Sequence, residues 1–219
     1  SNYFVYGLGV FDVMLEGQIA ATDVNADGIA LSVADLVYLI RVVVGDALPY
    51  PKEVVTVNAN YSHAHSGLMT VNNARIGAAN VIVEGNATPE LLVDNMEMIY
   101  NYDGVNTRIL VYSLEGNSFT GEFLNVNGNV VSIEMATAEG NPVAAKVIPT
   151  EFALKQNYPN PFNPRTTMAF ELPKAADYDL RIYNINGQEV AAFAGHADAG
   201  TVNISWDASN HASGIYFYK

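Results

Sequence analysis

The sequence contains the segment Gln156-Asn-Tyr-Pro-Asn-Pro-Phe-Asn-Pro164, and the alternating run Thr166-Thr-Met-Ala-Phe-Glu-Leu172 follows it closely. Proline fixes its own backbone and restricts the residue before it, so the segment predicts a rigid, extended entry into a β-strand. Further on, side chains alternate in character over Tyr178–Tyr183 and Val202–Trp206, and Asn186-Gly187 predicts a hairpin turn. We therefore predict a small β-sandwich of about seven strands over residues 149–219.

This C-terminal module resembles the type A C-terminal sorting domain of type IX secretion substrates. The resemblance is carried by Tyr158–Pro164, by Tyr183-Asn-Ile-Asn-Gly-Gln-Glu-Val190, by Trp206-Asp207 and by Ser213-Gly-Ile-Tyr-Phe-Tyr218. It implies that the type IX secretion machinery carries the chain across the outer membrane of a Gram-negative-type bacterium. We therefore expect an extracellular protein, or one attached to the outer cell surface.

Residues 52–148 show the period-two pattern of half-buried strands. The run Val131–Met135 alternates apolar and polar side chains. Tight-turn signals rich in Gly and Asn separate similar runs at residues 68–72, 79–83, 96–102, 107–114 and 118–126. We predict a second β-sandwich here. The segment Met98–Leu124 resembles part of a cohesin-like sandwich.

Residues 1–48 contain a candidate calcium loop. Oxygen donors occur at every second position from residue 23 to residue 27, and Gly28 follows where an EF-hand-type loop turns sharply. The candidate ligands are Asp23, Asn25, Asp27, the main-chain carbonyl of Ile29 and the carboxylate of Asp35, which lies one residue beyond the usual closing position. We expect calcium as the cofactor. The alternative is a metal-free turn, rich in Asp and Asn, that caps a helix.

A short helix is predicted after this loop, because apolar residues recur at helical spacing and Gly45 gives a stop; they are Leu36, Leu39, Ile40 and Val43. The stretch Asp23–Gly45 resembles one type I dockerin repeat, and Asn2–Leu8 resembles the last helix of a partial first repeat. The resemblance implies a partner that carries a cohesin. Because residues 52–148 are themselves cohesin-like, we expect the partners to be other copies of this chain, or other cohesin- or dockerin-bearing proteins.

Composition limits the classes of partner. The formal net charge is −13, from 10 basic and 23 acidic residues, which argues against nucleic acid as a partner. The chain has no cysteine, so disulfides and thiolate metal sites are excluded. The apolar run Leu36–Val44 is interrupted by Arg41 and is too short to cross a bilayer, so we expect no membrane span. The chain starts at Ser1 without a methionine, and we expect a processed or truncated product.

The fold class predicted from these patterns is mainly β, with two β-sandwich domains preceded by a short α-helical calcium-loop segment. We assign residues 1–48 to the dockerin-like segment, 52–148 to the cohesin-like sandwich and 149–219 to the sorting-type sandwich. The first boundary lies at Pro49-Tyr50-Pro51, where the pattern changes to period two, and the second lies at Pro149.

No familiar catalytic motif is present, whether a Gly-x-Ser-x-Gly elbow, a His-Glu-x-x-His helix or a phosphate loop, and we expect no enzyme activity. His63 and His65 form a possible pair of metal ligands, but no carboxylate stands beside them, and a solvent-exposed loop is the simpler interpretation.

Our leading hypothesis is a structural or adhesive extracellular protein that associates through its dockerin-like and cohesin-like parts, as a polymer or filament of its own copies. The alternative is the C-terminal scaffold or anchoring part of a larger secreted hydrolase. A third hypothesis is direct carbohydrate binding by exposed tyrosines such as Tyr112 or Tyr216.

Overall fold

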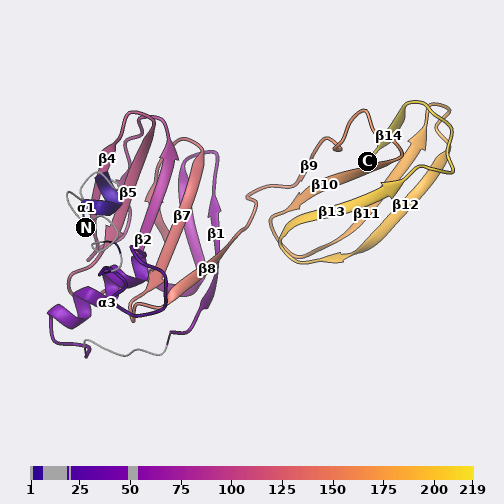
Figure 1. Ribbon diagram of the computed structural model, residues 1–219. Helices are drawn as coiled ribbons and strands as arrows, with labels where there is room; N and C mark the ends of the chain where they lie inside the picture. Colours follow the sequence, from indigo (N-terminus) through magenta and orange to yellow (C-terminus); the bar gives the residue numbers. More distant parts are fainter. Residues whose placement is uncertain (1, 7–18, 20, 49–53) are drawn as a thin grey trace. The chain divides into compact units, whose positions relative to one another are not determined.

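The structure is a computed structural model that describes residues 2–6, 19, 21–48 and 54–219 (Figure 1). The chain divides into two compact units, Ser1–Lys146 and Val147–Lys219. Both consist mainly of strands in the described residues, and the prediction of a mainly β protein of the sandwich type is confirmed. Within these residues, no helix has the length and apolar character that a bilayer crossing requires.

The first unit contains eight strands in its described residues and a pair of helices on one face. The strands pair in the order β1-β8-β7-β2-β5-β4, β6 pairs with β2 and β3, and β1 also pairs with β2. Their bounds are β1 (Val57–His63), β2 (Leu68–Glu84), β3 (Glu90–Leu91), β4 (Glu97–Tyr102), β5 (Asn106–Tyr112), β6 (Phe119–Asn125), β7 (Val130–Thr137) and β8 (Pro142–Val147).

The long strand β2 belongs to both layers of this unit. Its first part pairs with β1 and β6, and its second part, from Ile76 onward, pairs with β5 and β7. The register shifts between Val71 and Ile76, where Asn73 has a φ of 70°. Such an irregularity bends a strand and re-aims its side chains. The core enclosed by the strands includes Met69, Val81, Ile109, Phe123 and Met135, all at most 1% exposed.

The outer face of the β7-β2-β5 layer is covered by helices of the same unit. Helix α3 (Val33–Val43) contacts β7 and β2, and helix α1 (Asn2–Tyr6) contacts β5 and β4 (Figure 1). Their apolar side chains form one buried cluster with three sheet residues, Ala78, Leu110 and Ala136. Because side chains alternate across a strand, the neighbouring Ala79, Ile109 and Met135 face the sandwich core instead.

Small residues allow the helix to lie close to the sheet. Gly140, in the turn between β7 and β8, has a φ of 75°, and a Cβ there would lie 3.1 Å from Cβ of Tyr38 and 3.2 Å from the carbonyl oxygen of Ala34.

Helix α3 begins at a capping box, in which the Ser32 side chain accepts from the Asp35 N–H and the Asp35 side chain accepts from the Ser32 N–H.

Residues 1–48 and 52–148 were predicted as separate domains, but their described residues lie in one compact unit. The boundary between them falls on residues 49–53, outside the described part of the chain. Asn2–Tyr6 is helical, as expected for the proposed remnant of a first repeat, whereas residues 7 and 8 are not described.

The second unit is built from two three-stranded sheets, β13-β10-β9 and β12-β11-β14. It therefore has six strands where about seven were predicted. Residues Met168, Leu180, Ile182 and Trp206 form its buried cluster. The predicted hairpin joins β11 and β12, with a φ of 75° at Gly187. The bounds are β9 (Ala153–Leu154), β10 (Arg165–Leu172), β11 (Ala176–Asn184), β12 (Glu189–Ala197), β13 (Gly200–Asp207) and β14 (Tyr216–Tyr218).

Candidate functional site

The predicted ligands Asp23, Asn25 and Asp27 lie together in a tight loop before α3. The Asp23 carboxylate accepts from the N–H groups of Asp27 and Gly28, both at 3.1 Å. Asn25 Oδ1 accepts from the Asp27 N–H at 3.1 Å, and Asn25 Nδ2 donates to Asp27 Oδ2 at 3.0 Å. Three oxygen-bearing side chains therefore turn into the same loop, which is the arrangement that calcium coordination requires of its first ligands.

The backbone of the loop takes the conformation that this arrangement needs. Ala26 has a φ of 59° and Gly28 a φ of 85°, and the region of positive φ is one that glycine enters without steric cost. Ile29 donates its N–H to Asp27 Oδ1 at 2.8 Å, and its side chain is exposed. The Ile29 side chain thus takes no part in the loop interior, in keeping with a role for its main chain alone.

Asp35 has a different environment from the other three acidic or amide side chains. Its Oδ1 accepts from the N–H groups of Val24 (2.8 Å) and Asn25 (3.3 Å), and its Oδ2 accepts from the N–H (3.0 Å) and hydroxyl (2.7 Å) of Ser32. The side chain is buried, and burial raises the pKa of the Asp35 carboxyl, with these hydrogen bonds acting in the opposite direction. Asp35 therefore ties the loop to the helix N-terminus through main-chain N–H groups and the Ser32 hydroxyl, and its described hydrogen bonds include none to the side chains of the other predicted ligands.

The described residues contain no group of three or more His, Cys, Asp or Glu side chains placed to share a metal ion. A calcium ion in this loop would thus rely on Asp23 and Asp27 as carboxylate ligands, with Asn25 Oδ1 and main-chain oxygen completing the set. The donor types fit calcium, because all of them are oxygens.

Glu134 is a contributor that sequence reasoning missed. Its Oε1 accepts from the Val33 N–H at 2.7 Å and so satisfies an otherwise unpaired group at the start of α3. Burial raises the pKa of the Glu134 carboxyl, and the charges of Asp35 and Asp27 raise it further. Across the β2–β7 pair stands Asn80, whose buried Oδ1 makes no hydrogen bond to the described residues. The acidic loop is therefore coupled electrostatically to the sheet beneath it.

In the second unit, the Pro/Asn segment is fastened to strands β10 and β14 by polar contacts. Asn157 Nδ2 donates to Thr166 Oγ1 at 2.9 Å, and the Asn157 N–H donates to the Tyr218 hydroxyl at 2.9 Å. The Tyr218 hydroxyl in turn donates to the Lys155 carbonyl at 2.8 Å, and Thr166 donates to the Pro159 carbonyl at 2.9 Å. The side chains of the sequence motif thus hold one another in place.

The same segment lines a pocket of about 570 Å³ in the second unit. Trp206 is 5% exposed, and its ring lies 5.6 Å from that of Phe162 and 4.9 Å from that of Tyr216, centroid to centroid. Rings at these separations attract one another in tilted or edge-to-face arrangements. The aromatic residues of the motif therefore serve as the packing centre of this small domain.

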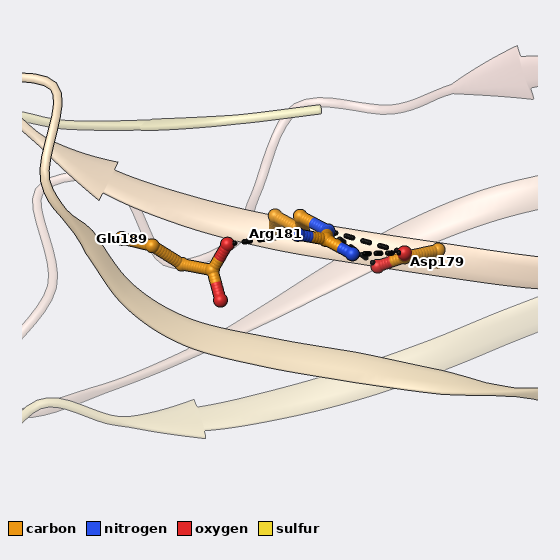
Figure 2. Close-up of polar contacts among 3 residues, drawn as sticks. All are labelled: Asp179, Arg181 and Glu189. Atoms are coloured by element: carbon orange, nitrogen blue, oxygen red, sulfur yellow. Dashed lines mark hydrogen bonds and ion pairs between the residues drawn. The ribbon is translucent and has the colours of Figure 1, made fainter.

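Figure 2 shows the charged contacts on the outer surface of this unit. Arg181 binds the Asp179 carboxylate through Nε and Nη2, the latter at 2.7 Å, and binds Glu189 through Nη1 at 3.1 Å. The Arg181 hydrogen bond and charge hold the pKa of Asp179 below its usual range. Because all three side chains are well exposed to water, the cluster contributes little to stability.

The comparisons with known proteins concern chiefly this second unit, a small two-sheet domain at the C-terminus. Residues 156–219 match the family described as the secretion system C-terminal sorting domain. No curated protein matches the chain. A solved structure titled "Cytokine receptor complex - Crystal form 2" aligns at 12% identity over 73% of this chain and 86% of that chain, but its TM-score of 0.18 carries no argument.

The type IX sorting domain predicted from the Pro/Asn motif is thus confirmed for residues 156–219. It follows that the protein is secreted, to the extracellular space or the cell surface, and that it interacts with the secretion machinery. The match leaves out residues 1–155, and the dockerin-like and cohesin-like parts stay predictions.

Proposed function

We propose that the protein is a non-enzymatic structural or adhesive component outside the cell, which associates with other copies of itself through a helix-on-sheet contact. One observation carries this proposal: helix α3 and its acidic loop already lie on the outer face of the β7-β2-β5 layer. The chain therefore possesses both surfaces of a docking contact. In this proposal the helical surface acts as the dockerin-like part and the sheet surface as the cohesin-like part.

The two surfaces are different, so a contact between copies would be heterologous. Heterologous contacts close into a ring or continue as a filament, according to whether the rotation between neighbours closes. The contact seen within one chain and the contact between chains would use the same residues, with α3 of one copy placed on the sheet of the next. Exchange of an identical element between copies is a known route to association of this kind.

Calcium is part of the proposal. Ion binding by Asp23, Asn25 and Asp27 would fix the loop that precedes α3 and neutralise charge beside Glu134, whose pKa the loop carboxylates raise. Calcium would thereby favour the docked position of the helix. Chelation should accordingly loosen the contact, whether it forms within a chain or between chains.

A cysteine cross-link can separate the two arrangements, because the chain contains no cysteine of its own. A Cβ at Gly140 would lie 3.1 Å from Cβ of Tyr38. This distance is a few tenths of an ångström shorter than the Cβ–Cβ separation of about 3.5–4.5 Å found in disulfides. One chain would carry Tyr38→Cys and a second would carry Gly140→Cys. After mixing and mild oxidation, a disulfide-linked dimer is expected on a non-reducing gel, in larger yield with calcium than with chelator.

The matched control replaces Gly140→Cys with Gly116→Cys, because Gly116 has the same φ of 75° but open space beside its Cα. It should give no dimer with the Tyr38→Cys chain. A double variant that closes the disulfide within one chain, combined with no dimer from the mixed single variants and a monomer by light scattering in both buffers, would refute association between copies. Failure of the double variant to cross-link would contradict the docking itself.

A further inference from the structure

A second possible ion site lies at the other end of the first unit, where two loops meet. A pocket of about 270 Å³ is formed by the turn between β1 and β2 and by the loop between β6 and β7. The turn contributes His63, His65 and Gly67, and the loop contributes Asn127 and Gly128. Sequence spacing alone placed the two histidines near each other, whereas the fold adds Asn127 from 60 or so residues away.

A backbone hydrogen bond holds the neutral His63 ring in one tautomer. Its Nε2 lies 2.9 Å from the carbonyl oxygen of Val126. A carbonyl oxygen carries no proton, so Nε2 must be the donor, and the neutral ring then has its lone pair on Nδ1. Metal-binding histidines characteristically donate their other ring N–H to a backbone carbonyl in this way, because it fixes the tautomer and the ring orientation.

Oxygen atoms converge on the same turn. Gly67 has a φ of 90°, and a Cβ there would lie 2.6 Å from Asn125 Oδ1, 2.8 Å from Asn127 Oδ1 and 3.0 Å from the Val126 carbonyl oxygen. A side chain at this position would displace the two carboxamides, and the positive φ itself favours glycine. The Asn127 carboxamide therefore lies beside the turn that carries the histidines.

The chemistry of this donor set favours one class of ion. Imidazole nitrogens suit zinc, copper and nickel, whereas calcium and magnesium prefer oxygen ligands with carboxylates among them. Among the described residues, the lining of the pocket includes no carboxylate. We propose that His63 Nδ1, the His65 imidazole and the Asn127 carboxamide oxygen bind a divalent transition-metal ion, with zinc as the reference case and water filling the remaining position.

The site is separate from the calcium loop in both position and ligand type. Three further facts make it testable: the chain has only four histidines, His196 pairs with Asp177 in the second unit, and His211 packs against Trp206. A histidine variant in the second unit is therefore a control that leaves the pocket intact.

The test is zinc chloride titration of the full chain by calorimetry, in saturating calcium so that the acidic loop is occupied. The parent is expected to bind one zinc ion per chain at the pocket. His63→Gln and His65→Gln should each weaken zinc binding about tenfold or more, since each removes one of two nitrogen ligands. The His196→Gln control should stay within about twofold of the parent, because it leaves the two nitrogen ligands in place. The His63→Gln variant keeps a side-chain N–H that can donate to the Val126 carbonyl. Thermal melting of each variant in the absence of zinc verifies that it is folded.

A second measurement distinguishes metal binding from a structural effect of the substitutions. In the ¹⁵N spectrum of the parent, zinc should shift the Nδ1 resonance of His63 far more than its Nε2 resonance, because Nε2 stays bonded to Val126. The proposal is overturned if the parent shows no saturable zinc binding, if both pocket variants bind zinc as the parent does, or if His63 Nε2 is the nitrogen that responds.

Discussion

Leu110→Ala should destabilise the first unit strongly, because the helices bury this side chain against the sheet. Leu110 is 0% exposed on β5 and belongs to the cluster shared with α1 and α3, while its neighbours Ile109 and Val111 face the sandwich core. Leu→Ala at such a position lowers the free energy of unfolding by about 2–5 kcal/mol. In a unit of this size, about 3 °C is lost per kcal/mol, so the melting temperature should fall by about 6–15 °C.

The assay is differential scanning calorimetry of the full chain, in which the second unit serves as an internal reference. Its transition should not move, because Leu110 belongs to the first unit. The matched control is Leu114→Ala, the same substitution at a side chain that is 51% exposed in the same unit. It should change the free energy of unfolding by less than about 0.5 kcal/mol.

The reasoning depends on the helices covering this face of the sheet. If α3 and α1 lay elsewhere, Leu110 would point into water, and its truncation would cost no more than that of Leu114. A melting temperature within about 1 °C of the parent for Leu110→Ala would therefore refute the packing of the helices on β5 and β2.

Four other outcomes are expected. Ser32→Ala removes the helix cap and should lower the melting temperature of the first unit by about 3 °C, for a loss of about 1 kcal/mol; no change would contradict the capping box. The folded-state pKa of Glu134 is raised, so its contribution to stability is full below the unfolded-state pKa and is lost as pH rises through the folded-state value. Glu134→Gln should thus gain in melting temperature relative to the parent as pH rises above about 4.3, the ordinary glutamate pKa, and a pH-independent difference would argue against this sign. Asp27→Ala should lower the melting temperature in saturating calcium but not in chelator, so equal melting of variant and parent in calcium would exclude the loop as an ion site. Trp206→Ala removes about 3–5 kcal/mol from the second unit and should leave the protein inside the cell, as an immunoblot of cells and medium would show; undiminished secretion would separate export from folding of this unit.

Features set by local sequence were predictable. The Pro/Asn motif before Arg165 identified the sorting domain, and the motif is fixed to Thr166 by hydrogen bonds that span fewer than ten residues. The two-residue spacing of Asp23, Asn25 and Asp27 was sufficient to predict that these side chains meet in one loop. Period-two alternation placed Glu134 and the core-facing Met135 on opposite faces, but Val131, predicted to share the face of Met135, is 56% exposed, because the register of β7 on β2 shifts beside it.

Features set by tertiary packing were not predictable from pattern. The runs at 68–72 and 79–83 were predicted as separate strands, but they form one strand, because a register shift near Asn73 lets the chain bend without leaving the sheet. The contact of Glu134 with Val33 and the proximity of Asn127 to His63 join residues about 100 and 60 positions apart, and no spacing rule covers such distances. The position of α3 on the sheet is likewise a matter of which apolar faces meet.

The strand β2 has a consequence for how the first unit opens. Since its two parts hydrogen-bond to four different strands, one layer cannot peel away while the other stays intact. Amide protons on both sides of the bend should therefore exchange with solvent through one common opening event, at a rate set by global unfolding. A protein that must persist outside the cell, beyond the reach of chaperones, benefits from having no partially open form for a protease to attack.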